Sequence, residues 1–353
     1  MATRHRRTRT RTYAESGVDR SAIVRALTAL LAEVHGRPPS SHGRLLELPG
    51  HFAGIVRIGQ ESIAATTDTV GTKVLLADRM NRWEEVGEDL VAINVNDLAA
   101  IGARPAALLD TIVCARPDPA RFRSIGRGLQ RGLVASRCSL LGGETAVVPD
   151  LVHDIDLGAT GLGFFPRGRS PVTGARTRAG DRLIGLPSTG VHSNGYTLLR
   201  RVLEEGKVDP RRPRPGSRIP VGVELLRPTR IYSEMVDAIA DHSGVHGLAH
   251  LSGGGVRNLV RLRSDVRFEL DRWPIIPPLF DWVRTMGGIA PSEMFQTFNM
   301  GIGFVVAVAP AARETIVRLL ARHGAPDAVE IGRVRAGRGV SLPGLGLEYD
   351  TYS

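Results

Sequence analysis

The stretch Thr67-Asp68-Thr69-Val70-Gly71-Thr72-Lys73, or TDTVGTK, follows directly on a strand-like segment at residues 62–67. It combines a carboxylate, hydroxyls, a glycine and an amine on one turn, and these groups suit a metal-bound polyphosphate. In that interpretation Asp68 takes the cation and Lys73 supplies a compact positive charge to the phosphates. The alternative is a surface turn in which Asp68 caps the next segment. The turn lacks the GxxxxGK[ST] spacing of a P-loop, so that fold is not supported.

Outward from this turn, strand and helix signals alternate along the chain. Apolar spacing predicts helices at residues 19–34, 91–98 and 122–133, and strands at 54–58, 62–67, 106–113, 138–141 and 156–165. Beyond a segment rich in Pro, Gly and Arg at 166–181, it predicts strands at 182–187 and 300–309, and helices at 196–203, 224–239, 256–262 and 311–322. The sequence therefore predicts a two-domain α+β or α/β protein. The expected divisions are a disordered tail at 1–12, an N-terminal domain at 13–167 and a C-terminal domain at 168–345.

The composition is that of an ordinary globular protein with an arginine-rich start. Lys+Arg total 46 against 36 Asp+Glu, the net charge is +10, and 42% of the residues are hydrophobic. Only Lys73 and Lys207 are lysines, and five arginines fall within residues 4–11. We expect that tail to be solvated, with a nonspecific nucleic-acid contact as the alternative. The charge spread elsewhere predicts no specific nucleic-acid partner.

The length of the apolar stretches and the number of cysteines limit the class of protein and its location in the cell. The longest apolar stretches, such as 302–310, are about half of the roughly 20 residues that a membrane span needs, so no membrane insertion is expected. Cys114 and Cys138 are the only cysteines. They exclude a disulfide framework and a four-cysteine zinc site, and they fit a reducing cytosol. With no apolar signal segment at its start, the protein is predicted to be cytoplasmic.

Acidic and amide side chains recur in the first domain. Asn94 and Asp97 lie three apart on one face of a largely apolar predicted helix, and either a structural or a ligand role is open for them. Asp110 interrupts an apolar strand, where a buried carboxylate needs a partner or a cation. The segment Gly142-Gly143-Glu144 places an acid just past a strand, after two glycines that let a ligand approach. Together with Asp68, these acids form a set that suits Mg²⁺, provided that they converge.

Two glycine-flanked turns lead into helices in the second domain. Residues 188–195, STGVHSNG, carry His192, which is either an acid–base or substrate-binding group or a plain loop histidine. Residues 250–255, HLSGGG, open the next predicted helix. Backbone N–H groups at helix starts bind anions, and a triple glycine permits close approach. For each turn, the alternative is a tight loop without a ligand.

Eight motifs, taken in order, resemble one family. They are YAESGVD (13–19), TDTVGTK (67–73), VNDL (95–98), GGETA (142–146), GVHSNGYTLLR (190–200), LLRPTRIY (225–232), GLAHLSGGG (247–255) and EMFQTFNMGIG (293–303). In order and spacing they resemble phosphoribosylformylglycinamidine cyclo-ligase, also called AIR synthetase, an enzyme of purine synthesis. The resemblance runs from about Tyr13 to Gly332.

The resemblance implies both a fold and a reaction. The fold is AIR synthetase-like, with an N-terminal ATP-binding domain whose sheet pairs across a homodimer and a C-terminal α/β domain. The reaction is the ATP- and Mg²⁺-dependent ring closure of formylglycinamidine ribonucleotide to aminoimidazole ribonucleotide in the cleft between domains. ATP phosphorylates the formyl oxygen, and the substrate's own nitrogen then closes the ring and releases phosphate. Such an enzyme mainly positions groups and neutralises charge.

By motif, the resemblance also implies site residues. The expected catalytic residues are Lys73, His192 and Asp97, and the expected metal ligands are Asp68, Asp97 and Glu144. The expected ATP-binding residues are Asp68, Thr69, Gly71, Thr72, Lys73, Asn94, Asp110, Gly142 and Gly143. The expected substrate-binding residues are His192, Ser193, Asn194, Gly253, Gly254 and Gly255.

The chain departs from the family pattern at residues 40–48, at Thr69, in its arginine-rich extension, and after GGETA, where residues 147–150 are VVPD and many members carry an acid and a methionine. Residues 40–48 hold one glycine where the family has a glycine-rich segment, and Thr69 replaces a glycine of the usual DGVGTK. The alternative on the same architecture is a thiamine-monophosphate kinase-like enzyme, although that kinase lacks the HSNGY and FNMG segments. Selenophosphate synthetase relies on a reactive cysteine or selenocysteine near its N-terminus, and a hydrogenase-maturation dehydratase relies on a C-terminal cysteine. This chain has no cysteine before Cys114 and none at its end.

Overall fold

The fold is taken from a computed structural model that describes residues 12–34, 42–46, 48 and 50–352. The predicted tail therefore lies almost entirely outside the described residues, and so do positions 40, 41 and 47 of the glycine-poor stretch. Within the described part of the chain, no helix combines the length and the apolar character that a membrane crossing requires.

Six strands of the N-terminal half form one sheet in the order β1-β2-β3-β6-β4-β5. They are β1 (Arg44–Leu46), β2 (Gly54–Ile58), β3 (Glu61–Thr69), β4 (Arg104–Cys114), β5 (Ser139–Val147) and β6 (Ile155–Phe164). β4 and β5 run parallel, and the other neighbours are antiparallel. The register places Asp68, Ala159, Asp110 and Gly143 in one row across β3, β6, β4 and β5.

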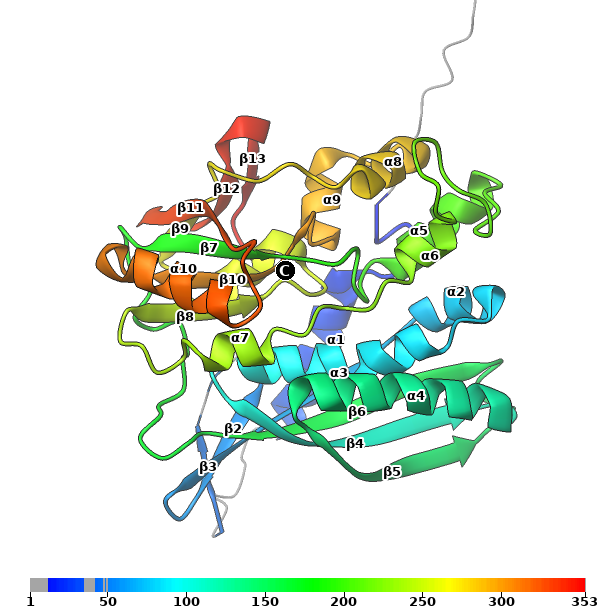
Figure 1. Cartoon of the computed structure of the whole chain (residues 1–353), viewed down its shortest axis with the longest axis horizontal. Helices are drawn as coiled ribbons and strands as arrows, with labels where there is room; N and C mark the ends of the chain where they lie inside the picture. The colour runs from blue at the N-terminus through cyan, green and yellow to red at the C-terminus, as the bar shows by residue number, and fades with distance from the viewer. Residues whose placement is uncertain (1–11, 35–41, 47, 49, 353) are drawn as a thin grey trace, which may run out of the picture.

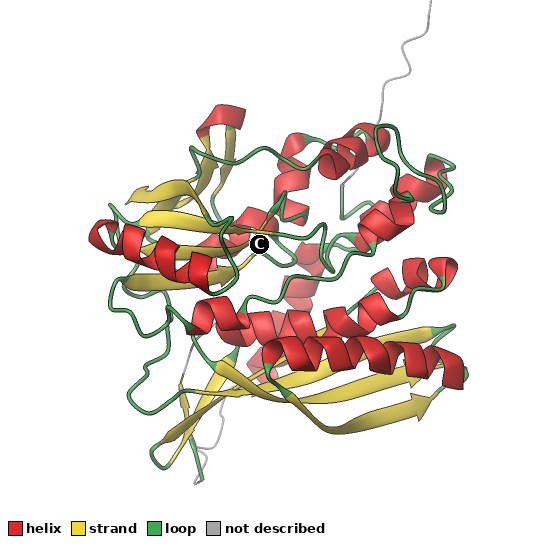
Figure 2. Cartoon of the chain, viewed as in Figure 1, coloured by secondary structure: helices red, strands yellow, loops and turns green. Residues whose placement is uncertain are grey.

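Helices lie on one face of this sheet (Figures 1 and 2). They are α2 (Lys73–Met80), α3 (Glu84–Ala99) and α4 (Pro119–Ser136). Ala64 and Val70 of the β3 segment are buried on the helical face, whereas Thr67 and Thr69 are exposed on the opposite face. The exposed face also includes Leu109 of β4, so it combines polar and apolar side chains.

Seven strands of the C-terminal half form the second sheet, in the order β13-β12-β9-β11-β7-β10-β8. They are β7 (Arg182–Pro187), β8 (Val245–His250), β9 (Val266–Glu269), β10 (Ile302–Val308), β11 (Val329–Ala336), β12 (Gly339–Leu342) and β13 (Leu347–Tyr349). The accompanying helices are α5 (Tyr196–Glu205), α6 (Val221–Leu225), α7 (Ser233–Asp237), α8 (Pro278–Gly287), α9 (Pro291–Thr297) and α10 (Arg313–Arg322). β10 is buried along its whole length between β7 and β8, which suits its unbroken apolar sequence.

The predicted two-domain α+β class is confirmed, and most predicted elements lie near their expected positions. The N-terminal helix is α1 (Arg20–Val34). Asp19 caps this helix, because its Oδ1 accepts from the backbone N–H of Ser21 and Ala22 at 2.9 and 3.2 Å. Six apolar side chains of α1 are exposed: Ile23, Val24, Leu27, Leu30, Leu31 and Val34.

Two element predictions are wrong, and one predicted helix is of a different type. The helix at 224–239 is instead two short helices, α6 and α7, because Pro228 lies between them and cannot continue a helix. The helix at 256–262 is a 3-10 helix, Gly255–Arg261. β5 extends to Val147, so Glu144 lies within the strand and not past its end.

Helix α3 joins the two halves of the molecule. It lies between the six-stranded sheet and the C-terminal domain, where it contacts α7 and β8 (Figure 1). Although α3 is largely buried, it carries the polar residues Asp89, Asn94 and Asn96 among its buried side chains. Buried polar groups need partners, and Asp89 and Asn96 find theirs in the C-terminal domain.

Candidate active site at the domain interface

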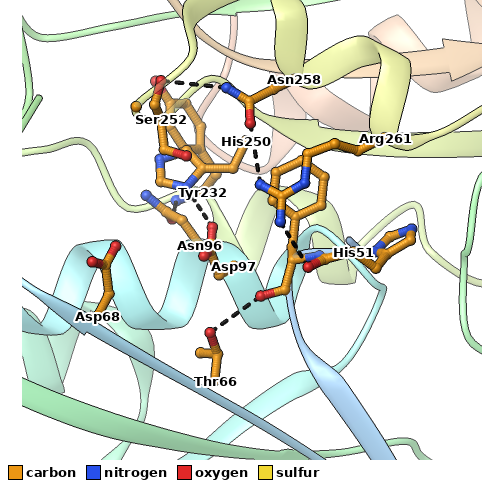
Figure 3. Close-up of polar contacts among 12 residues, drawn as sticks. His51, Thr66, Asp68, Asn96, Asp97, Tyr232, His250, Ser252, Asn258 and Arg261 are labelled. Atoms are coloured by element: carbon orange, nitrogen blue, oxygen red, sulfur yellow. Dashed lines mark hydrogen bonds and ion pairs between the residues drawn. The ribbon is translucent and has the colours of Figure 1, made fainter. Parts of the chain in front are cut away.

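The last turns of α3 present polar groups to the C-terminal domain. The Oδ1 of Asp97 lies 2.8 Å from the Nδ1 of His250, at the end of β8 (Figure 3). One residue earlier, the Nδ2 of Asn96 donates to the carbonyl of Arg230 at 2.8 Å, and its Oδ1 accepts from the backbone N–H of Tyr232 at 2.8 Å. These contacts attach α3 to two segments of the other domain.

Asp68, at the end of β3, lies beside this helix on the helical face of the sheet (Figure 3). Burial raises the pKa of Asp68 to about 6, and the nearby charge of Asp97 adds to the rise. The carboxylate accepts a hydrogen bond from the backbone N–H of Thr69 at 2.8 Å. Two neighbouring carboxylates that repel one another favour a bound cation, because the cation removes the repulsion.

A cation of the chain itself lies near these acids. Arg261 donates to the carbonyls of Gly50 and His51 at 2.6 and 2.7 Å, and its guanidinium lies 4.0 Å from the centre of the Phe52 ring. Its positive charge lowers the pKa of Asp68, against the larger effect of burial. We call Asp68, Asp97, His250 and Arg261 the interdomain polar cluster, since these residues come from both domains.

The triple-glycine turn begins at Gly253, three residues after His250. Asn258 donates to the carbonyls of Ser252 and Gly255 at 3.3 and 3.0 Å, which stabilises the turn. Gly255 has a φ of 54°, and a Cβ there would lie 2.0 Å from the carbonyl oxygen of Phe295. Only glycine fits this position without a shift of the backbone. Close packing of the turn therefore explains at least one of its glycines.

Lys73 is not on a surface turn, and its placement does not fit the predicted phosphate contact. Its Nζ is fully buried and lies 2.5 Å from an oxygen of Asp89 on α3. It also donates to the carbonyls of His192 and Arg227 at 2.9 and 3.1 Å. Two carbonyl oxygens and one carboxylate oxygen thus lie within 3.1 Å of the ammonium. Burial lowers the pKa of Lys73, while the carboxylate of Asp89 opposes that change.

His192 has an unusual backbone and a buried ring. Its φ is 61°, in the left-handed region that non-glycine residues rarely occupy. Its Nε2 accepts from the backbone N–H of Thr189 at 3.3 Å, and its Nδ1 has no hydrogen-bond partner among the described residues. Burial lowers its pKa well below the ordinary value, and the neighbouring His250 adds to the effect. The imidazole is therefore neutral at pH 7.

The other predicted positions of the second domain lie close to this histidine. The hydroxyl of Ser193 is 3.2 Å from that of Thr229, and Asn194 is half-buried next to it. In the TDTVGTK turn, Gly71 has a φ of 64°, and the hydroxyl of Thr72 lies 3.1 Å from that of Thr197. The turn thus contacts the C-terminal domain through Thr72 as well as Lys73.

The predicted acid set does not converge within one chain. A Cβ on Gly143 would lie 2.3 Å from the Oδ1 of Asp110, so position 143 faces the helical side of the sheet. Because side chains alternate along a strand, Glu144 points to the opposite side from Asp68 and Asp97. Among the described residues, no group of three or more His, Cys, Asp or Glu side chains is arranged to hold a metal ion.

The placement of Asn94 also does not fit the expectation that this residue binds ATP. It is buried, and its Nδ2 donates to the carbonyl of Leu90 at 3.0 Å, one turn earlier in α3. The residues that sequence reasoning missed are Asp89, Asn96, His250 and Arg261. His250 lies within the motif GLAHLSGGG, and that motif could have identified it as a second candidate histidine. Nothing in the local sequence singles out Asp89 or Arg261, because their partners lie far along the chain.

Two domain families match the chain. The model described as AIR synthase related protein, N-terminal domain, matches residues 50–165, and the C-terminal domain of the same family matches 178–343. The phosphoribosylformylglycinamidine cyclo-ligase of Methanothermobacter thermautotrophicus is 43% identical over 320 residues, which cover 89% of this chain and 93% of that protein. The protein of the same name from Thermococcus kodakarensis is 38% identical over 351 residues, covering 96% and 99%.

Solved structures give a consistent fold. The structure of AaThiL complexed with AMPPCP and TMP superposes with a TM-score of 0.64 at 19% identity, covering 94% of this chain and 96% of that one. The thiamine-monophosphate kinase from Stenotrophomonas maltophilia K279a gives a TM-score of 0.62 at 21% identity, covering 91% and 96%. At such low identity, the likeness establishes the architecture alone.

Proposed function

Because the chain belongs to the phosphoribosylformylglycinamidine cyclo-ligase family, which carries out the AIR synthetase step of purine biosynthesis, we propose that the interdomain polar cluster is where this reaction occurs. The supporting observation is the contact between Asp97 and His250, which joins the two domains beside Asp68. Around it lie the turns at 67–73, 190–195 and 250–255, each of which came from a motif of the family.

Mg²⁺ is part of this proposal. Asp68 and Asp97 fit it chemically, because both supply hard oxygen ligands and because the charge of Asp97 raises the pKa of Asp68, an effect that a bound cation would oppose. When bound, Mg²⁺ neutralises charge on the phosphates of ATP. We assign Asp68 and Asp97 to this role. Glu144 is not part of the same group, since it lies on the other face of the sheet.

The residues of the chain then position ATP and substrate. We assign Thr69, Gly71 and Thr72 to the nucleotide side and residues 192–194 and 253–255 to formylglycinamidine ribonucleotide. The formyl oxygen attacks the γ-phosphorus of ATP, ADP leaves, and the C–O bond is activated. The substrate nitrogen then bonds to that carbon, loses a proton and expels phosphate. His192 serves best as a neutral hydrogen-bonding group, because burial keeps its imidazole uncharged.

We also propose that the enzyme is a homodimer formed through the exposed face and edge of the six-stranded sheet. β5 is an edge strand in which Leu140, Leu141 and Val147 are exposed, and Leu109 of β4 is exposed on the open face. Uncovered strand edges with apolar side chains promote pairing. A second copy placed there would meet Glu144, so any role of Glu144 at the nucleotide depends on the partner.

A cytoplasmic location completes the proposal. Cys114 and Cys138 are both buried, and both are free thiols. Free thiols persist in a reducing compartment.

The function is tested by measuring ADP formation with and without formylglycinamidine ribonucleotide, at saturating Mg²⁺, with the imidazole product followed by mass spectrometry. We expect one aminoimidazole ribonucleotide for each ADP, and loss of both products when the metal is chelated. Thiamine monophosphate is the control substrate. Phosphorylation of thiamine monophosphate without ring closure would overturn the proposal.

A further inference from the structure

The ion pair between Lys73 and Asp89 lies entirely inside the molecule. Both side chains are fully buried, and the pair joins α2 to α3 within the N-terminal domain. A buried ion pair contributes little net stability, because the loss of hydration offsets the attraction of the charges. Stability alone therefore does not account for this pair, and its other contacts suggest what it does.

Those other contacts reach two loops of the C-terminal domain. Lys73 donates to the carbonyl of His192 in the loop at 188–195 and to that of Arg227 in the loop at 226–232. Asp89 accepts from both the backbone N–H and the hydroxyl of Thr229 at 2.8 and 2.6 Å. The hydroxyl of Thr229 is in turn 3.2 Å from that of Ser193. The pair thus bonds both loops at once.

The bond to His192 is made at a strained residue. With a φ of 61°, His192 occupies a conformation that its neighbours must maintain. The Lys73 bond to its carbonyl is one such restraint, and the bond from Thr189 to its ring is another. Because the direction of the imidazole follows from the backbone angles, release of the carbonyl would move the ring.

We propose that Lys73 and Asp89 are positioning residues, which hold the loops at 188–195 and 226–232 in the geometry that binds the nucleotide substrate. This role replaces the phosphate contact, and it rests on the proposed function of residues 192–194 as substrate-binding. Lysine suits the position because its compact ammonium donates to two carbonyls and lies 2.5 Å from the carboxylate of Asp89. A guanidinium is wider and has five donors, so it does not match this set.

The first experiment separates positioning from ATP contact. In Lys73→Met we expect the KM for formylglycinamidine ribonucleotide to rise and kcat/KM to fall roughly 100-fold, as for a misplaced binding group. The Kd for ATP, measured by titration calorimetry, should stay within about threefold of wild type. Lys207→Met is the matched control, because Lys207 is the only other lysine and is exposed. A weakened ATP affinity with an unchanged substrate KM would overturn the inference.

A double variant covers the case in which the single variant does not fold. Lys73→Met leaves the charge of Asp89 buried without its counterion, whereas Lys73→Met with Asp89→Leu removes both charges. We expect the double variant to melt near wild type and still to lose substrate affinity. Thr229→Val removes one bond to Asp89 at nearly constant shape, and it should show the same change to a smaller degree. Wild-type kinetics in a folded double variant would show that the pair is only structural.

Hydrogen exchange gives a readout that is independent of activity. We expect the backbone amides of 188–195 and 226–232 to exchange faster in Lys73→Met than in wild type, while those of β10 stay protected. Unchanged exchange in both loops would contradict the inference even if activity fell. The wild-type assay separates the two hypotheses: no ring closure by wild type refutes the proposed function, whereas normal wild-type activity with unchanged loops in the variant refutes the positioning role.

Discussion

The carboxylate of Asp97 on α3 and the imidazole of His250 at the end of β8 lie 2.8 Å apart across the boundary between the two domains. The side chain of His250 is buried, so the contact is shielded from water. This contact thus connects the acid that we assign to Mg²⁺ with the strand that leads into the triple-glycine turn. Because of this contact, a change at Asp97 should affect the proposed site directly.

Asp97→Asn keeps the shape of the side chain and removes its charge. We expect turnover to fall about 10- to 100-fold, the usual effect of disturbing a metal ligand or its immediate partner, while the circular dichroism spectrum is unchanged. The assay is steady-state ring closure over a Mg²⁺ titration. Asp265→Asn, at an exposed position, is the control. Near-wild-type activity of Asp97→Asn at low Mg²⁺ would remove this residue from the site.

Asp68 predicts a pH dependence of stability. Its pKa is raised from 3.8 to about 6, so the folded protein binds this proton more tightly than the unfolded chain does. The ionised carboxylate of Asp68 therefore lowers the free energy of unfolding above pH 6. This loss of stability disappears as the pH falls toward 4. Without metal, Asp68→Asn should gain up to about 2 kcal/mol at pH 8, after allowance for partial exposure, and almost nothing at pH 4. Urea unfolding in a chelator measures both values, and equal gains at the two pH values would contradict the raised pKa.

Gly255→Ala tests the packing of the triple-glycine turn. The new Cβ would lie 2.0 Å from the carbonyl oxygen of Phe295, at a φ of 54°. We expect a loss of at least about 2 kcal/mol in the free energy of unfolding, together with loss of ring closure. Gly344→Ala is the matched control, since a Cβ there meets nothing within 4 Å. Equal melting temperatures for the two variants would show that the turn adjusts without cost.

Leu109→Asp tests the dimer. Leu109 lies on the open face of the six-stranded sheet and is 38% exposed. Burial of a carboxylate in an apolar interface is unfavourable, so we expect wild type to scatter light as twice the 38.0 kDa of one chain and the variant to dissociate toward one chain. Ile275→Asp is the control, because Ile275 is 96% exposed on a loop of the other domain. A wild type that is a stable, active monomer would end the dimer proposal.

Much of the local structure could be predicted because it depends on neighbouring residues. The spacing of apolar residues predicts α1, and the Asp19 cap beside Ser21 marks its beginning. The apolar run of β10 likewise predicts a buried strand, because a strand that is covered on both faces needs no alternation of polar and apolar residues. The turn motifs, taken in order, were also sufficient to indicate the family.

The candidate site depended on contacts that no local pattern contains. Lys73 bonds to carbonyls that lie 119 and 154 residues further along the chain, and Asp97 meets His250 at a separation of 153. Glu144 also lies in one of the ordered family motifs. Because side chains alternate along β5, however, its side chain points to the other face of the sheet. Sequence alone determined which residue types and turns are present. Only the packing of α3 between the two domains decided which of them meet, because a side chain's direction is set by the backbone and its partners by the opposing domain.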